Sequence, residues 1–172
     1  MKALRKNLQL SLALLLSLYA PLSLATLTDD LQLVGEARLR VLFWSIYDSS
    51  LYTITGRYFG VEPKLTLRIN YLRKIKSRQL LDRTSEEWEK NSIIEQDIET
   101  WLEKLASILP DVKKGETLTL QVEDNLSSSF YLNDELIDNI EDAAFTQAFL
   151  SIWLSDKSSY PCLLYTSDAA DE

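Results

Sequence analysis

The clearest alternation of apolar and polar positions lies in residues 64–72, KLTLRINYL. One face of this segment carries four apolar side chains, those of Leu65, Leu67, Ile69 and Tyr71. The other face carries Lys64, Thr66, Arg68 and Asn70. A period of two predicts a half-buried strand with a solvated back. Residues 117–123, TLTLQVE, repeat the pattern, with the side chains of Leu118, Leu120 and Val122 expected to point inward.

Residues 37–53, ARLRVLFWSIYDSSLYT, begin with the same alternation and then become apolar and aromatic on both sides. We interpret residues 36–47 as one long central strand, with residues 49–52 still extended and most of VLFWSIY in the core. Gly56 and residues 60–63 predict a turn. Residues 128–140 read as two short strands around Asn133 and Asp134, a pair that favours a tight hairpin turn.

Three segments change to the helical period. Residues 77–90 place Leu81, Thr84 and Trp88 on one stripe. Residues 94–109 form a stronger amphipathic pattern that Pro110 ends, made by Ile94, Ile98, Trp101, Leu102, Leu105, Ile108 and Leu109. Asp142 is placed to cap a last helix, whose apolar face is Phe145, Ala148, Phe149, Ile152 and Trp153. The order of strands, two helices, strands and one helix predicts an α+β fold, an antiparallel sheet with helices on one face.

Both ends of the 172-residue chain differ from this pattern. Residues 1–25 combine a cationic start, an apolar run and a small-x-small ending, so we expect a signal peptide cleaved after Ala25, with an uncleaved membrane anchor as the alternative. Residues 162–172, CLLYTSDAADE, resemble a translated sequencing adapter that replaces the native C-terminus. We therefore expect a single domain over residues 26–161 and no membrane span after cleavage.

The composition of the chain excludes several kinds of catalytic and metal-binding site. The chain has no histidine, and its only cysteine, Cys162, lies in the suspect tail, so we expect no cysteine nucleophile, no histidine base, no metal site and no cofactor. Removing three cations with the leader and three acidic residues with the tail leaves the net charge at −8. An acidic chain with no patterned arginine and aromatic motif is a poor nucleic-acid binder, so we expect no nucleic-acid partner. We expect a monomer.

Four segments together resemble the bacterial secreted members of the chalcone isomerase-like superfamily: VGEARLRVLFWSIYDSSLYT, YLRKIKSRQLLDRTSEEW, LPDVKKGETLTL and FYLNDELIDNIEDAAFTQAFLSIWL. The resemblance runs from about Leu33 to Pro161. It implies an open-faced β-sandwich, in which a large antiparallel sheet is covered by a helical layer with a cleft between them. Plant members cyclise a chalcone in this cleft. Related non-catalytic members hold a fatty acid there, with an arginine and a tyrosine at its carboxylate.

The resemblance also suggests site residues. The segment from Gly35 to Arg38 is similar to the G-x-G-x-R segment of the plant enzymes, which puts Arg38 in the place of their functional arginine. Tyr47 stands where the plant strand carries a threonine, and Ile152 stands where the last plant helix carries a substrate-contacting threonine. Two polar contacts are thus changed, which argues against chalcone isomerase activity.

Physical chemistry allows the same residues to form a carboxylate site. A guanidinium offers two parallel donors and a phenol a third, which Arg38 or Arg40 with Tyr47 would provide. The alternative is that both arginines face water on an edge strand. Most aromatic residues are expected in the core, but Tyr47 and Tyr71 are candidate ligand contacts because a buried phenol requires a partner.

These observations give three hypotheses. The first, which we favour, is non-catalytic binding of a small apolar or fatty-acid-like ligand by Arg38, Tyr47, Arg40 and Tyr71. The second is a cofactor-independent isomerase acting on a chalcone-like or other enone, in which Arg38 and Tyr47 stabilise an oxyanion. The third is an envelope protein that acts through partner contacts, which an exposed apolar patch would favour. In each case we expect a secreted protein in the periplasm of a Gram-negative bacterium.

Overall fold

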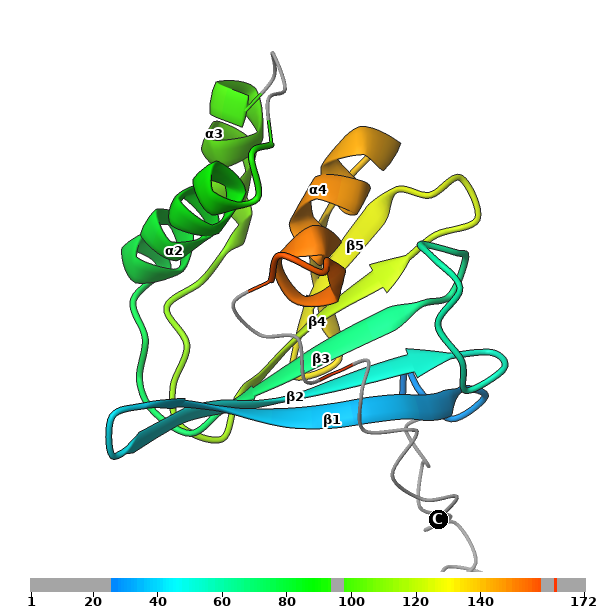
Figure 1. The fold of residues 1–172 in the computed structure, drawn as a ribbon, viewed down its shortest axis with the longest axis horizontal. Helices are drawn as coiled ribbons and strands as arrows, with labels where there is room; N and C mark the ends of the chain where they lie inside the picture. Colours follow the sequence, from blue (N-terminus) through cyan, green and yellow to red (C-terminus); the bar gives the residue numbers. More distant parts are fainter. Residues whose placement is uncertain (1–25, 94–97, 159–162, 164–172) are drawn as a thin grey trace, which may run out of the picture.

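One antiparallel sheet and a layer of helices make up the part of the protein that its computed structural model describes, residues 26–93, 98–158 and 163. The strands are β1 (Gln32–Val41), β2 (Trp44–Thr53), β3 (Thr66–Tyr71), β4 (Thr117–Val122), β5 (Ser128–Leu132) and β6 (Glu135–Ile140). Their order in the sheet follows the chain, and every neighbouring pair is antiparallel. The helices α2 (Ser77–Lys90), α3 (Ile98–Ile108) and α4 (Ala143–Leu154) lie over one face of the sheet (Figure 1). The predicted α+β class and one-sided helical layer are confirmed.

Alternation along β3 and β4 decides which side chains face the helices. The predicted inward residues of both strands are buried: Leu65, Leu67, Ile69, Tyr71, Leu118, Leu120 and Val122. The outward side of β3 is polar, and Arg68 there pairs with Asp134 at 2.9 Å while the Asn70 amide donates to the Thr117 hydroxyl at 3.1 Å. The sheet therefore has one apolar face against the helices and one polar face away from them.

The helices α2 and α3 form an excursion between β3 and β4. Its two arms meet again at the Ile75–Val112 bridge, where the backbone nitrogens of both residues donate to the partner's carbonyl at 3.0 and 2.9 Å. The chain thus leaves and re-enters the sheet at the same end. The predicted helix 77–90 is confirmed, whereas the first turn predicted for the next helix, including Ile94, lies outside the described residues.

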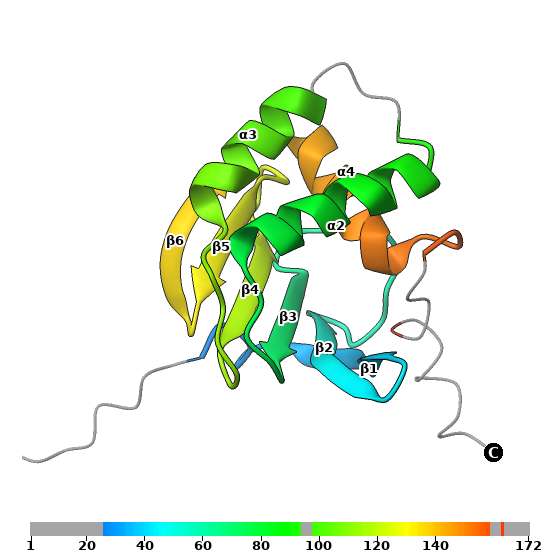
Figure 2. The same cartoon turned by 90° about the vertical axis from the view of Figure 1, so that its left-hand side faces the viewer.

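The last helix, α4, lies beside α2 and α3 over the same face of the sheet (Figure 1), and in the turned view it is seen behind α2 (Figure 2). The Asp142 carboxylate caps it, accepting from the backbone nitrogens of Ala144 and Phe145 at 2.8 and 3.1 Å, as predicted. The buried indole of Trp88 on α2 donates to the Ala148 carbonyl at 2.9 Å, which fixes α2 against α4. The predicted apolar face of α4 is buried.

The segment 36–47 is not one central strand. The chain reverses at Leu42 and Phe43, so that β1 and β2 form a hairpin at the edge of the sheet. The side chains at this reversal extend past the end of the sheet, where no helix covers them, and they are exposed by 48% at Val41, 86% at Leu42, 98% at Phe43 and 60% at Trp44. The prediction that most of VLFWSIY is core is therefore wrong. The buried face of the hairpin begins further along β2, at Tyr47 and Leu51.

The structure describes little of either end of the chain. The predicted leader, residues 1–25, and Cys162 lie outside the described residues, and Leu163 alone of the predicted tail is described, as a buried side chain. No described helix has the length and apolar character needed to cross a membrane.

Candidate ligand-binding cavity

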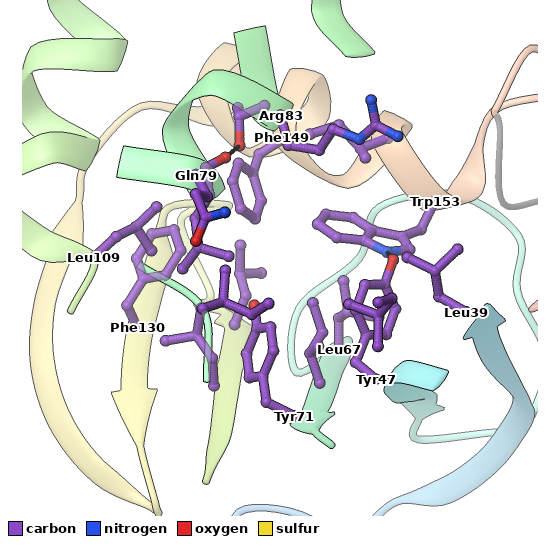
Figure 3. Close-up of a pocket in the computed structure, with 18 of the residues that line it drawn as sticks. Leu39, Tyr47, Leu67, Tyr71, Gln79, Arg83, Leu109, Phe130, Phe149 and Trp153 are labelled. Carbon is purple, nitrogen blue, oxygen red and sulfur yellow. Dashed lines mark hydrogen bonds between the residues drawn. The ribbon is translucent and has the colours of Figure 1, made fainter. Parts of the chain in front are cut away.

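A cavity of about 300 Å³ lies between the apolar face of the sheet and the helices α2 and α4 (Figure 3). Thirteen of its lining side chains are apolar: Leu39, Val41, Ile46, Leu67, Ile69, Ile75, Leu80, Leu109, Leu118, Leu120, Phe130, Phe149 and Ile152. The lining residues with polar side-chain atoms are Tyr47, Tyr71, Gln79, Arg83, Thr84 and Trp153. A mostly apolar wall with a few polar groups is the usual make-up of a small-molecule site.

Two of the polar groups in the cavity wall form a hydrogen bond with each other. The Trp153 indole nitrogen on α4 donates to the Tyr47 hydroxyl on β2 at 3.0 Å, and both side chains are buried. The Tyr47 and Tyr71 rings meet edge to face, with centroids 6.0 Å apart and planes at 71°. This arrangement joins strand and helix, and it holds the Tyr47 phenol in place.

The Tyr71 hydroxyl is the polar group directed into the cavity from the sheet (Figure 3). Its side chain is buried, and among the described residues no group forms a hydrogen bond with that hydroxyl. Burial, with a smaller contribution from Tyr47, raises the pKa of the Tyr71 phenol well above its usual range. Tyr71 is therefore a neutral phenol that can donate a hydrogen bond to a bound molecule.

The helix α2 provides the polar rim of the cavity. Gln79 and Arg83 are one helical turn apart and both are exposed, while Thr84 between them and the core donates its hydroxyl to the Leu80 carbonyl at 3.0 Å. The Arg83 guanidinium forms an ion pair with Glu86 on the helix surface, where both side chains are about half exposed. A cation and a carboxamide thus stand where the cavity opens.

The two arginines predicted for the site lie on the other face of the sheet. Arg38 is opposite Asp48 in the β1–β2 ladder and binds its carboxylate through Nε at 2.5 Å and a terminal nitrogen at 2.8 Å. Leu39, the next residue, is opposite Tyr47 and faces the cavity. Because successive side chains of a strand point to opposite faces, Arg38 cannot share a site with Tyr47. The expectation that they act together is therefore corrected.

The outer face instead forms a shallow polar groove along β1 and β2, lined by Glu36, Ala37, Arg38, Arg40, Asp48, Ser49 and Ser50. Within it the hydrogen bond from Arg38 outweighs burial and holds the pKa of Asp48 below its usual range, and the same bond raises the pKa of Arg38. Arg40 thus faces the groove and not the cavity. The alternative that both arginines face water on an edge strand describes their observed position.

Of the residues that the sequence related to a ligand site, Tyr47, Tyr71 and Ile152 line the cavity. Arg83 and Gln79 were missed. The sequence does contain a pattern that could have indicated them. The spacing of Gln79, Leu80, Arg83 and Thr84 places all four side chains on one stripe of α2. The helical period instead indicated the stripe of Leu81, Thr84 and Trp88, of which Trp88 is in the core, Leu81 is half-buried and only Thr84 lines the cavity.

The lining limits the chemistry of the cavity. Its ionisable side chains are those of two tyrosines and one arginine, with no carboxylate among the lining residues. Across the described part of the chain, no group of three or more histidine, cysteine or acidic residues is arranged to hold a metal ion. The arrangement can bury an apolar body, donate hydrogen bonds to it and place a cation at its exposed end.

Comparisons with known proteins agree with this architecture. Residues 20–160 match the family described as chalcone isomerase-like. A Haemophilus influenzae protein described as uncharacterized is 28% identical over 130 residues, which cover 75% of this chain but only 63% of that protein. The crystal structure of a fatty-acid binding protein of Arabidopsis thaliana superposes with a TM-score of 0.61 at 13% identity, covering 78% of this chain and 84% of that one. At this identity the likeness to the plant structure concerns the fold.

Proposed function

Because this chain belongs to the chalcone isomerase-like family, we propose that its cavity binds a small apolar or amphipathic ligand, a fatty-acid-like carboxylate, without catalysing a reaction on it. The observation that supports this is the apolar cavity of about 300 Å³ between the sheet and the helices. That volume stands at the lower end of the ~300–1,000 Å³ usual for small-molecule sites, which favours a single acyl chain over a whole lipid. The structural similarity to a plant fatty-acid binding protein supports the same class of ligand.

The polar groups suggest how such a ligand would lie. Its acyl chain would fill the apolar interior, and its carboxylate would meet Arg83 and Gln79 at the rim. Arg83 now forms an exposed ion pair with Glu86, and such surface pairs stabilise a protein by only ~0–1 kcal/mol, so a ligand carboxylate can replace Glu86 at little cost. In this proposal Arg83 takes the role that the sequence suggested for Arg38. Tyr71 and Tyr47 are proposed contacts within the cavity.

The isomerase alternative has less support. Its oxyanion was to be stabilised by Arg38 and Tyr47 together, and these side chains lie on opposite faces of the sheet. The cavity lining also offers no carboxylate or histidine that could act as a general base. Binding needs neither group.

We also propose that the protein is exported, as the layout of residues 1–25 indicates. Cell fractionation of a Gram-negative host, followed by N-terminal sequencing of the recovered protein, tests this directly. A mature chain that begins at Thr26 in the periplasmic fraction supports the proposal. An intact leader in the cytoplasm contradicts it.

The binding proposal can be tested by filling the cavity. Leu80 and Leu81 are adjacent on α2 and both half-buried, but only Leu80 lines the cavity. We expect Leu80→Trp to abolish binding of a fluorescent polyene fatty acid, while Leu81→Trp retains it. Thermal unfolding of both variants controls for overpacking. Equal binding by wild type and Leu80→Trp would contradict the proposed site.

A further inference from the structure

The hairpin tip, residues 41–44, is a run of four consecutive exposed apolar side chains. Phe43 at its end is almost fully exposed. Single exposed apolar residues are common, but a contiguous exposed run of this kind marks an interaction site. Leu42 at its centre also has a positive φ of 54°, which an L-residue with a bulky side chain rarely adopts. Solubility and local backbone preference would both favour other residues here.

The hairpin tip stands beside the opening of the cavity. Val41 belongs to the tip, is half exposed and also lines the cavity, as the exposed residues Gln79 and Arg83 of α2 do. The β1–β2 turn and the first turn of α2 lie at the same end of the molecule (Figure 1). Whatever contacts the tip therefore comes close to the entrance of the cavity.

Cationic side chains gather at the same end, although the chain as a whole carries a charge of −8. Residues 73–78 contain four of them, Arg73, Lys74, Lys76 and Arg78, and no acidic residue. The Arg73 guanidinium carbon lies 4.4 Å from the centroid of the Trp44 ring, which places this segment directly against the hairpin tip.

A loop next to this segment, joined to it by the Ile75–Val112 bridge, adds further cations. The Gly115 nitrogen donates to the Tyr71 carbonyl at 2.7 Å, which brings the loop carrying Lys113 and Lys114 to the end of β3. The two acidic residues of that loop are already engaged by cations, Asp111 by Lys76 at 2.5 Å and Glu116 by Lys113 at 3.7 Å. The hydrogen bond from the Asn133 nitrogen to the Thr117 carbonyl brings two more acidic residues, Asp134 and Glu135, to this end. The six cations still outnumber the four acidic residues, so this end is positive in an otherwise acidic protein.

We propose that the hairpin tip docks on the surface of an anionic lipid bilayer. Leu42 and Phe43 would enter the boundary between headgroups and acyl chains, Trp44 would lie at the headgroup level where tryptophan is enriched, and the surrounding cations would meet lipid phosphates. Charge favours this occupant over a second copy docked tip to tip, because the two positive ends would repel each other. Docking depends only on the tip and its cations, so it does not require the proposed ligand. If both proposals hold, the cavity opens toward the lipid from which an acyl ligand comes.

A fluorophore on the hairpin tip provides a local test in the full chain. An environment-sensitive dye is attached at Phe43→Cys in a Cys162→Ser background, and vesicles of equimolar phosphatidylcholine and phosphatidylglycerol are added. The matched control is Phe59→Cys, another exposed phenylalanine, in the loop between β2 and β3 at the other end of the sheet (Figure 1). We expect a blue shift and a gain in emission from the tip label alone. Because the dye reports its own position, membrane binding by residues 1–25 does not produce this signal.

Charge variants test the second half of the proposal. We expect Arg73→Glu to weaken vesicle binding of the tip label roughly fivefold or more, and Arg57→Glu, near Phe59, to leave it unchanged. Added salt and pure phosphatidylcholine should each weaken it similarly. The proposal is overturned if both labels respond alike or if lipid charge has no effect. It is also overturned if the tip label becomes buried without vesicles as protein concentration rises, because the tip would then bind a second copy.

Discussion

The indole of Trp153 on the last helix donates a hydrogen bond to the hydroxyl of Tyr47 on the second strand, across 3.0 Å in the wall of the cavity. The two residues are 106 positions apart in the chain. Their hydrogen bond is thus a direct connection between the sheet and the helix that bounds the cavity. It also explains how a buried phenol and a buried indole are tolerated beside so many aliphatic side chains.

Removing the Tyr47 hydroxyl should destabilise the protein without altering its ring packing. We expect Tyr47→Phe to lower the free energy of unfolding by about 1–2 kcal/mol, because the Trp153 indole loses its acceptor in a buried place. Urea unfolding followed by circular dichroism measures this. Tyr52→Phe, on the same strand but outside the cavity lining, is the control and should change stability by less than about 0.5 kcal/mol.

Substitution of Arg83 separates recognition of a carboxylate from burial of an acyl chain. We expect Arg83→Gln to weaken binding of a fatty acid about tenfold, because a charge-assisted hydrogen bond is lost, and to leave binding of the corresponding alcohol almost unchanged. Isothermal titration with both ligands measures the difference. Arg78→Gln, an exposed cation on the same helix that does not line the cavity, should affect neither ligand. Equal losses for acid and alcohol would show that the Arg83 stem matters by packing.

The buried phenol of Tyr71 should make the protein less stable in alkali. Its folded pKa is raised above the unfolded value, so the stability it contributes is fully present below the unfolded pKa of ~10 and declines as pH rises toward the folded pKa. We expect Tyr71→Phe to flatten this decline between about pH 9 and pH 11. Urea unfolding over that range checks it. Tyr58 and Tyr131, whose pKa values are also raised, are present in both proteins and cancel in the comparison.

The helix cap Asp142 should make the protein sensitive to acid. Burial alone would raise its pKa, but hydrogen bonds from the Trp101 indole and the Phe145 and Ala144 amides outweigh burial and keep the pKa below its usual range. Stability from the charged carboxylate is therefore present above the unfolded pKa of ~3.9 and is lost as pH falls through the lower folded value.

Two variants separate the capping function of Asp142 from its charge. We expect Asp142→Ala to cost about 1–2 kcal/mol at neutral pH. Asp142→Asn should keep most of the cap and lose the acid dependence, as urea unfolding at neutral pH and near pH 3 would show. Asp124→Asn, in an exposed turn, is the control. An unchanged acid dependence in Asp142→Asn would assign that dependence to other carboxylates.

Sequence patterns predicted well those elements whose structure depends on residues close by in the sequence. The alternation from Leu65 to Tyr71 fixes one face of β3 regardless of the rest of the fold. Asn133 and Asp134 adopt positive φ values of 52° and 68°, as their turn chemistry predicts for a two-residue hairpin. The turn at Leu42 was not predicted, because it contains no glycine, proline or asparagine. Leucine gives no indication in the sequence that it adopts a φ of 54°.

The predicted site was only partly assembled, since Arg38 and Tyr47 lie on the two strands of a hairpin and not on one strand. Which β2 side chains share a face with Arg38 depends on the register of β1 against β2, in which Leu39 is opposite Tyr47 and a bulge between Leu39 and Arg40 shifts the pairing by one residue. Neither the reversal nor the bulge is visible in the alternation of a single strand. Tyr71 could be predicted because its own strand is regular. The stripe of α2 that contains Arg83 is visible in the sequence, but its position at the rim depends on how α2 packs on a sheet formed by distant segments.

The α2–α3 excursion has a consequence for how the protein folds. Apart from β3 and β4, every pair of neighbouring strands is joined by a connection that contains no helix, the longest being residues 54–65. The strands β1–β3 and β4–β6 are therefore two meanders that can each form from nearby segments. Pairing β3 with β4 closes the one long loop of the sheet, at an entropic cost that rises only slowly with loop length. Leu67 and Leu120 line the cavity from opposite sides of that closure. The cavity therefore comes into being at the step that unites the two halves, and neither meander contains it beforehand.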